Sequence, residues 1–170
     1  MLKFTTVLPI ALLSIGCAHA DHHPKEQPHA THEKAQKMSE QNGIIQLASA
    51  YSVAETVSRL EAALGERNVK VMAKVDHAAN AAGVDIALPA TTLVLFGNPA
   101  AGTQLMQASR SAAIDLPMKA LVYETDAGVF LEYNDIAYIA ERHGISANLP
   151  VLAKISGLLN AVATEATSAN

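Results

Sequence analysis

The sequence predicts a domain that combines β-strands with α-helices. Residues 91–96 form a run of β-branched and apolar side chains, which is typical of a strand buried on both faces. Residues 53–64 carry apolar side chains at helical spacing. Two further apolar runs, at 120–125 and 129–133, flank the turn sequence Asp-Ala-Gly and indicate an antiparallel hairpin. The 170 residues are enough for one domain of ordinary size with appendages at its ends.

The composition favours an aliphatic core and excludes several classes of function. Half of the residues are apolar, but only 4% are aromatic and there is no Trp, so Val, Leu, Ile and Ala must supply the core. The 12 basic and 16 acidic residues give a formal net charge of −4 without a basic block, which argues against a nucleic-acid partner. A single cysteine excludes an internal disulfide and a thiolate zinc cluster.

Residues 1–20 predict a signal peptide. Lys3 supplies the positive charge, residues 7–15 form the apolar segment, and Ala18 and Ala20 fit a small-x-small cleavage site. The apolar run is too short to cross a bilayer, for which about 20 residues are needed. No later segment of the sequence predicts a span. We therefore expect a periplasmic or secreted protein without a transmembrane segment in its mature chain.

Cys17 allows a different end to this segment. Ser14-Ile15-Gly16-Cys17 resembles a bacterial lipoprotein box, in which the cysteine is lipidated and becomes the first residue. Ser14 and Ile15 stand in the reverse of the usual order, whereas the cleavage site before Asp21 fits its pattern without a departure. We favour cleavage before Asp21. The alternative is an outer-membrane-anchored lipoprotein held through Cys17.

Residues 21–42 predict a flexible tail that can bind metal. The segment is polar, contains two prolines and lacks an apolar period, so it cannot bury enough surface to offset chain entropy. If the chain starts at Asp21, its free amine, two amide nitrogens and the His23 imidazole can form a square-planar site that suits copper(II) or nickel(II). The weaker candidate ligands are His22, His29 and His32. The alternative is a solvated histidine-rich linker.

The first half of the globular part predicts a strand, a helix and a second strand. Residues 44–49 are strand-like, and Ser52 with Glu55 forms a capping box for the helix that follows. The inner face of this helix carries Val53, Val57, Leu60 and Leu64. Residues 69–75 alternate apolar and basic side chains, as expected for a strand with one face in water. A short helical turn over 78–82 then ends at Gly83.

The second half predicts three further helices around the hairpin. Asn98 is a suitable N-cap, and Pro99 a suitable first residue, for a helix that continues to about residue 110. Its inward side chains are Leu105 and Met106. Asn134 or Asp135 caps a helix that ends at Gly144, the position that glycine favours after a helix. Pro150 begins the last helix, with an inner face of Leu152, Ile155, Leu159 and Val162.

Several short motifs follow one another along the chain between about residues 53 and 139. They are Lys74-Val75-Asp76-His77 with Ala78, Ala81 and Gly83, then Leu88-Pro89, residues 91–99 ending in Phe-Gly-Asn-Pro, Gly102-Thr103-Gln104-Leu105-Met106, Asp115-Leu116-Pro117, and Leu121-Val122-Tyr123-Glu124 with Gly128 and Tyr133. In these motifs the chain resembles the domain of unknown function 302 family.

This resemblance implies a fold but no reaction. The implied fold is an α+β domain with a small antiparallel or mixed sheet, helices packed mainly on one face, and a topology like that of TATA-box-binding proteins. The histidine tail and the helix at Pro150 lie outside the shared motifs. We therefore expect a family domain over residues 43–145 and a C-terminal helix within 146–170.

Asp76-His77 and Gly97-Asn98-Pro99 are the strongest candidate site residues. Each group follows a predicted strand, and strand ends on the same side of a sheet bring such turns together. Asp76 can orient His77 for proton transfer or ligand binding. Asn98 and the N–H groups after Pro99 can contact an anionic or carbonyl-bearing ligand. We therefore expect His77 and Asn98 to line one pocket. The alternative is structural, with Asp76 capping the turn that begins at His77.

Other polar residues give weaker signals for chemistry. His143 lies near a predicted helix C-terminus, where it can interact with the last carbonyls. Glu124 and Glu132 lie on the two hairpin strands and are candidates for a carboxylate pair. The sequence contains no P-loop, nucleophile elbow or His-Glu-x-x-His helix.

The sequence therefore predicts an exported binding or accessory module whose partner is a small molecule or a metal ion. One alternative is a copper- or nickel-handling protein that uses the N-terminal histidines. A second is an enzyme that uses Asp76 and His77 for acid–base chemistry.

Overall fold

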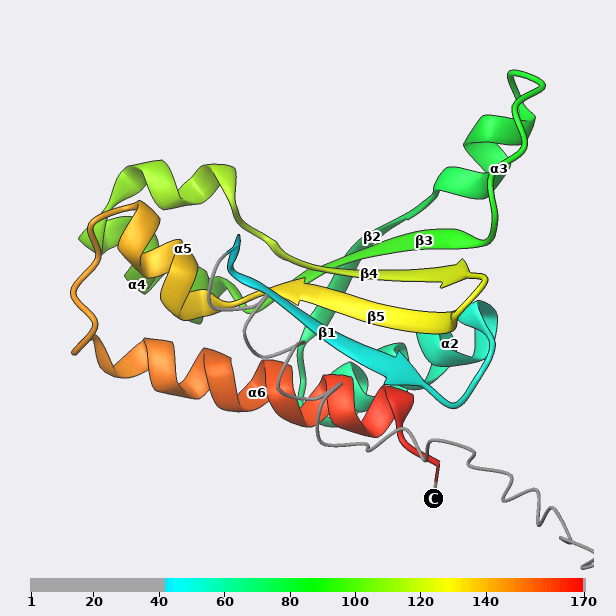
Figure 1. Cartoon of the computed structure of the whole chain (residues 1–170). Helices are drawn as coiled ribbons and strands as arrows, with labels where there is room; N and C mark the ends of the chain where they lie inside the picture. Colours follow the sequence, from blue (N-terminus) through cyan, green and yellow to red (C-terminus); the bar gives the residue numbers. More distant parts are fainter. Residues whose placement is uncertain (1–41, 170) are drawn as a thin grey trace, which may run out of the picture.

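The computed structural model describes residues 42–169, which form an α+β domain built on one five-stranded sheet (Figure 1). The predicted signal peptide, Cys17 and the candidate metal ligands from Asp21 to His32 lie outside the described residues. The strands are β1 (Ile44–Ser49), β2 (Lys70–Asp76), β3 (Thr91–Gly97), β4 (Met118–Thr125) and β5 (Gly128–Asn134). The helices are α2 (Val53–Glu66), α3 (His77–Ala82), α4 (Pro99–Ala108), the 3₁₀ helix η1 (Arg110–Ile114), α5 (Ile136–Arg142) and α6 (Pro150–Thr167).

The sheet has the order β1-β5-β4-β3-β2, and every neighbouring pair is antiparallel. The antiparallel alternative of the predicted fold class is therefore the correct one. The predicted hairpin is β4–β5, in which Thr125 pairs with Gly128 across the turn residues Asp126 and Ala127. Gly128 has φ +125°, a backbone conformation that side chains with a Cβ rarely adopt.

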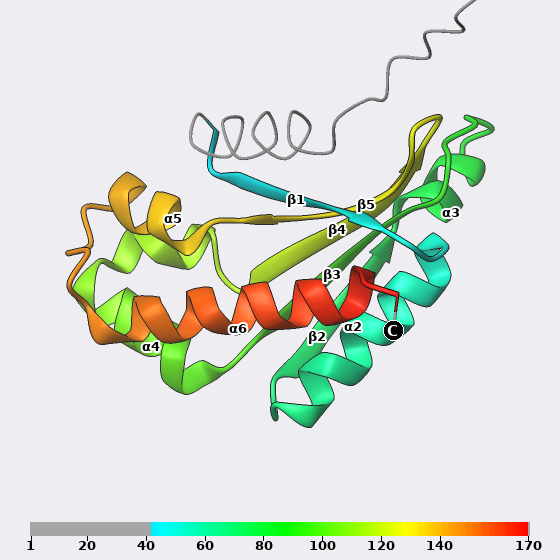
Figure 2. The same cartoon turned by 60° about the horizontal axis from the view of Figure 1, so that its bottom comes forward.

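Helices α2 and α6 cover one face of the sheet (Figure 2). On α2 the predicted inner face is confirmed, because Val53, Val57, Leu60 and Leu64 are all buried. On α6 the predicted inner face is likewise buried. Both helices share one core with side chains from the middle of the sheet, namely Val94, Phe96, Val122 and Leu131. The C-terminal helix therefore packs into the same core as the rest of the domain.

Among residues 42–169 no helix covers the other face of the sheet, which corrects the expectation that residues 91–96 are buried on both faces. Val94 and Phe96 point into the core and are 0% and 1% exposed. Leu93 and Leu95 alternate with them on the open face and are only half-buried. The apolar run therefore reflects a strand with one covered face.

A bulge interrupts the predicted alternation in β2. The pairing register shifts between Val71 and Ala73, so that Met72 is the extra residue and is 47% exposed. Beyond the bulge, Lys74 pairs with Val94 and therefore shares its face of the sheet. There the Lys74 ammonium lies 3.0 Å from a Glu61 carboxylate oxygen on α2. The bulge thus turns a basic side chain towards the helices.

The helices begin directly after capping side chains that can be recognised in the sequence. Ser52 Oγ accepts a hydrogen bond from the Glu55 N–H, which is the forward half of the predicted capping box. Asp135, one of the two predicted caps of α5, accepts from the Ala137 N–H. Gly144 follows α5 with φ +64°, as expected for a glycine after a helix end.

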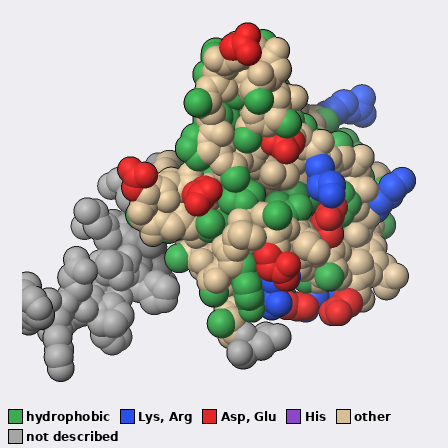
Figure 3. Space-filling view, turned by 90° about the vertical axis from the view of Figure 1, so that its right-hand side faces the viewer, with side chains coloured by type: hydrophobic (Ala, Val, Ile, Leu, Met, Phe, Trp, Pro, Cys, Tyr) green, Lys and Arg blue, Asp and Glu red, His purple; other side chains and the backbone are tan. Residues whose placement is uncertain are grey.

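The ends of the sheet carry different structures. Helices α4, η1 and α5 gather at one end, whereas α3 lies at the other (Figure 1). Residues 77–90, which we call the arm, project from the body and form the protrusion at the top of Figure 3. Val84 and Ile86 on this arm are 65% and 63% exposed.

Candidate functional site

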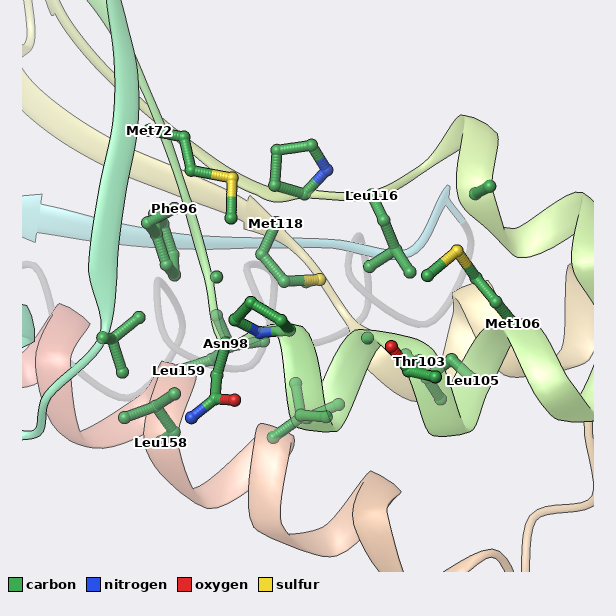
Figure 4. A pocket seen from close by; sticks show the side chains of 18 residues that line it. Met72, Phe96, Asn98, Thr103, Leu105, Met106, Leu116, Met118, Leu158 and Leu159 are labelled. Atoms are coloured by element: carbon green, nitrogen blue, oxygen red, sulfur yellow. The ribbon is translucent and has the colours of Figure 1, made fainter.

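A cavity of about 330 Å³ lies where β3 ends and α4 begins. Its walls come from β2, β3, α4, the segment between η1 and β4, and α6 (Figure 4). The lining is largely apolar and includes Met72, Phe96, Leu105, Leu116, Met118 and Leu159. A volume near 300 Å³ with apolar walls is at the lower end of the range for small-molecule sites.

Gly97, Asn98 and Pro99 line this cavity, as three of the five predicted ligand-binding residues. Asn98 Oδ1 accepts a hydrogen bond of 2.9 Å from the Ala100 N–H and so caps α4. The side-chain oxygen is therefore occupied, and the Asn98 amide nitrogen is the group that can donate to a ligand.

The N–H groups after Pro99 do not form the predicted anion site. The Ala100 N–H donates to the Asn98 side chain, and those of Ala101 and Gly102 donate to the Asn98 carbonyl at 3.1 and 3.0 Å. Helix α4 thus satisfies these donors itself. The cavity is therefore suited to an apolar molecule with one polar group rather than to an anion.

The prediction that His77 and Asn98 line one pocket is wrong, because β2 and β3 are antiparallel. Asp76 pairs with Thr92 at the start of β3, whereas Gly97 pairs with Lys70 at the start of β2. The six-residue offset along β2 corresponds to about 20 Å at about 3.3 Å per residue. His77 therefore lies at the arm end of the sheet and the cavity at the other end.

Asp76 has the structural role that the sequence left open as an alternative. Its carboxylate oxygen accepts a hydrogen bond of 2.9 Å from the Ala79 N–H and caps α3. The half-buried His77 is the first residue of the arm and follows Asp76, the last residue of β2. Any ligand binding by either residue would have to occur away from the cavity, because neither lines it.

The two hairpin glutamates lie on opposite faces of the sheet and do not form a pair. Glu132 is opposite Leu121, and Glu124 is three positions further along β4, opposite Val129. Glu132 instead accepts hydrogen bonds of 2.7 Å from both the Tyr123 hydroxyl and the Gln46 amide on the open face. Burial raises the pKa of Tyr123, and the hydrogen bond to Glu132 raises that pKa further.

His143 makes contacts that sequence reasoning missed. Its Nε2 lies 2.6 Å from Asp115 Oδ2, and its Nδ1 lies 2.9 Å from Ser111 Oγ. The His143 and Asp115 side chains are only 7% and 14% exposed. The residues are 28 and 32 positions apart and lie on η1, the segment after it and the end of α5, so no local spacing shows that they meet.

The sequence matches the family described as "Domain of unknown function DUF302" over residues 45–162. The chain belongs to the DUF302 family. The match extends beyond the motifs that end near residue 139 and includes most of α6. The packing of α6 against the sheet is consistent with a DUF302 domain that contains this helix.

One solved structure and two curated channel proteins are similar to this chain. The crystal structure of uncharacterized conserved protein DUF302 from Bacillus stearothermophilus superimposes with a TM-score of 0.67 at 15% identity, covering 74% of this chain and 98% of that one. This likeness shows the fold alone. The fluoride-specific ion channel FluC 1 of Brucella suis biovar 1 (strain 1330) is 40% identical over 119 residues. FluC 2 of Brucella melitensis biotype 1 has the same identity over the same length.

The DUF302 chain spans about half the length of these channel relatives. The alignments cover 68% of this chain but 47% and 44% of the two channels. Among residues 42–169, no helix has the length and apolar character needed to cross a membrane. In the same residues no three or more His, Cys, Asp or Glu side chains are grouped as metal ligands would be.

Proposed function

We propose that this protein binds a small, largely apolar molecule in the cavity at the end of β3. The observation that carries the proposal is an apolar-lined space of about 330 Å³ with the Asn98 side chain at its edge. Apolar cavities with a few polar groups are the usual form of small-molecule sites. The ligand that fits is compact, with an apolar body and one carbonyl or hydroxyl oxygen that accepts from the Asn98 amide nitrogen.

Three methionines support binding of more than one apolar shape. Met72, Met106 and Met118 approach the cavity from β2, α4 and β4 (Figure 4). Methionine side chains are unbranched and polarizable, so they adapt to irregular partners. Met72 is also the exposed bulge residue of β2, and its side chain can move without disturbing the core.

The test is a mass-spectrometric search for small molecules that co-purify with the folded protein. A matched pair of variants assigns any ligand to the cavity. At Gly102 an added Cβ would stand 3.8 Å from Leu116 in the cavity wall, so Gly102→Leu should extend a side chain into the space. His77→Ala changes a residue at the opposite end of the sheet and is the control.

We expect a ligand in the wild type and in His77→Ala, and its loss from Gly102→Leu. Circular dichroism of each variant checks that the domain is folded. A ligand retained equally by all three proteins would contradict the cavity assignment. No ligand in any protein, and no thermal stabilisation by a panel of apolar carbonyl compounds, would contradict the proposal as a whole.

The export and metal-binding predictions remain separate proposals. The charged, apolar and small-x-small pattern of residues 1–20 supports secretion, and the histidines from His22 to His32 support copper or nickel binding. Titration with copper(II), using protein with and without residues 21–32, tests the metal proposal. Equal binding by both proteins would exclude the tail as the site.

A second candidate function is that of an accessory domain for a fluoride-specific channel. Its support is the 40% identity over 119 residues with curated channels of that name. The alignments cover less than half of each channel. The test compares fluoride flux through a reconstituted channel of this type with and without the protein. Unchanged flux and no co-sedimentation with the channel vesicles would reject this candidate.

A further inference from the structure

We propose that Ser111 is a nucleophile for acyl transfer, activated by His143 and Asp115. The three side chains form an unbroken line from a carboxylate, through an imidazole, to a hydroxyl. Asp115 Oδ2 lies 2.6 Å from His143 Nε2, and His143 Nδ1 lies 2.9 Å from Ser111 Oγ. This is the arrangement that nucleophile activation requires: a base within hydrogen-bond reach of the nucleophile and a third group that orients the base.

The contacts define the direction in which the proton can move. Asp115 can only accept when ionised, so Nε2 carries the hydrogen and donates to it. Nδ1 is then the imidazole acceptor and takes the hydrogen of the Ser111 hydroxyl. The ring nitrogens have exchanged places relative to the usual Ser-His-Asp triad, but both are chemically able to serve as the base.

The proposed base and its carboxylate partner are largely buried, whereas the proposed nucleophile is exposed, as nucleophilic catalysis requires. The His143 and Asp115 side chains are 7% and 14% exposed, so their hydrogen bond is held in a largely water-free environment. Ser111 lies on the exposed side of η1, where a substrate can reach its Oγ. Arg142 adds a positive charge beside the carboxylate, 3.4 Å from Asp115 Oδ1.

The surroundings of Ser111 indicate the class of substrate. In a 3₁₀ helix, side chains three positions apart lie nearly above one another. Ile114 therefore stands next to Ser111, and it is 74% exposed. An apolar acyl group can lie against it, while the Ser109 hydroxyl, 3.1 Å from Ser111 Oγ, can donate to the developing oxyanion. We infer a carboxylic ester with a small apolar acyl group.

The reaction balances with water as the only co-reactant. Ser111 Oγ attacks the ester carbonyl carbon as its proton passes to His143 Nδ1. The tetrahedral intermediate collapses, the bond to the alcohol oxygen breaks, and the alcohol leaves with the proton from Nδ1. Water then attacks the acyl-serine and gives a proton to Nδ1, which returns that proton to Ser111 Oγ as the acid is released. Ester and water become acid and alcohol.

The test uses the full chain, a fluorophosphonate probe that labels activated serines, and p-nitrophenyl acetate as the ester. We expect the labelled peptide to contain Ser111, and Ser111→Ala to lose both labelling and ester turnover. His143→Gln should slow labelling by about 100-fold or more, the usual contribution of a general base. Ser58→Ala is the control, because it removes an exposed hydroxyl on α2, away from these three side chains, and should keep Ser111 labelled.

Two results would overturn the proposal. One is a folded wild-type protein in which Ser111 is labelled no faster than Ser109. The other is equal labelling of Ser111 in wild type and His143→Gln. If the hydrogen bonds among these three side chains are purely structural, Ser111 should be labelled no faster than Ser109. If His143→Gln does not fold, the wild-type labelling and the Ser111→Ala variant still decide, because Ser111 is exposed and its truncation leaves the core intact. The proposal does not depend on the cavity.

Discussion

Leu60→Ala should remove much of the stability of the domain. Leu60 is 0% exposed and lies on the face of α2 that packs against the sheet. Truncation removes three buried carbons, worth about 0.8 kcal/mol each, or about 2.4 kcal/mol together. A remaining void of about 50 Å³, at about 24 cal/mol per Å³, adds about 1.2 kcal/mol. The expected loss in the free energy of unfolding is therefore about 3–4 kcal/mol.

Urea denaturation followed by circular dichroism measures this loss directly. The control is Ser58→Ala, which changes an exposed residue on the outer face of the same helix and should stay within about 0.5 kcal/mol of wild type. A loss below about 0.5 kcal/mol for Leu60→Ala would mean that α2 is peripheral and would refute the packing described above. An equal loss in both variants would mean that the helix itself, rather than its buried face, is the sensitive feature.

Three further predictions concern a helix cap, a tyrosine and the mature N-terminus. Asp135→Ala should lower the free energy of unfolding by about 1 kcal/mol, because it removes the cap of α5; urea denaturation with no change would contradict this role. The raised pKa of Tyr123 means that its contribution to stability is present below pH 10 and is lost as pH rises through the folded-state pKa. Glu132→Gln should lower that pKa in an absorbance titration, and an unchanged pKa would show that burial alone sets it. Intact mass of protein from its native host should correspond to a chain that begins at Asp21 without lipid, and a lipid adduct on Cys17 would reverse this prediction.

Local signals predicted most elements of the fold. Asn98, Asp135 and Gly144 mark helix ends through side-chain hydrogen bonds or a positive φ, and both kinds of signal depend on residues that are neighbours in the sequence. The hairpin was predictable for the same reason, since a short turn fixes the direction of the second strand. These features need no knowledge of the rest of the chain.

Non-local features could not be predicted in the same way. The direction of β2 relative to β3 depends on the whole sheet, and the antiparallel pairing separates His77 from Asn98. The bulge at Met72 changes which side chains of β2 face the helices, although Lys70 and Lys74 stand at the spacing of one face of a regular strand. His143 and Asp115 meet only because α5 packs beside the segment after η1.

The positions of these groups make the two chemical proposals separable by experiment. The cavity lies at the end of β3 and is lined by Asn98 and Gly102. Ser111 is on the exposed side of η1 and is not among the lining residues. Ala113, two positions further along η1, does line the cavity, so the two sites share a structural element. If the acyl group of a substrate enters the cavity, Gly102→Leu should slow ester turnover as well as ligand binding. If the acyl group lies against Ile114 instead, as the exposure of that side chain favours, Gly102→Leu should abolish ligand binding and leave labelling of Ser111 unchanged.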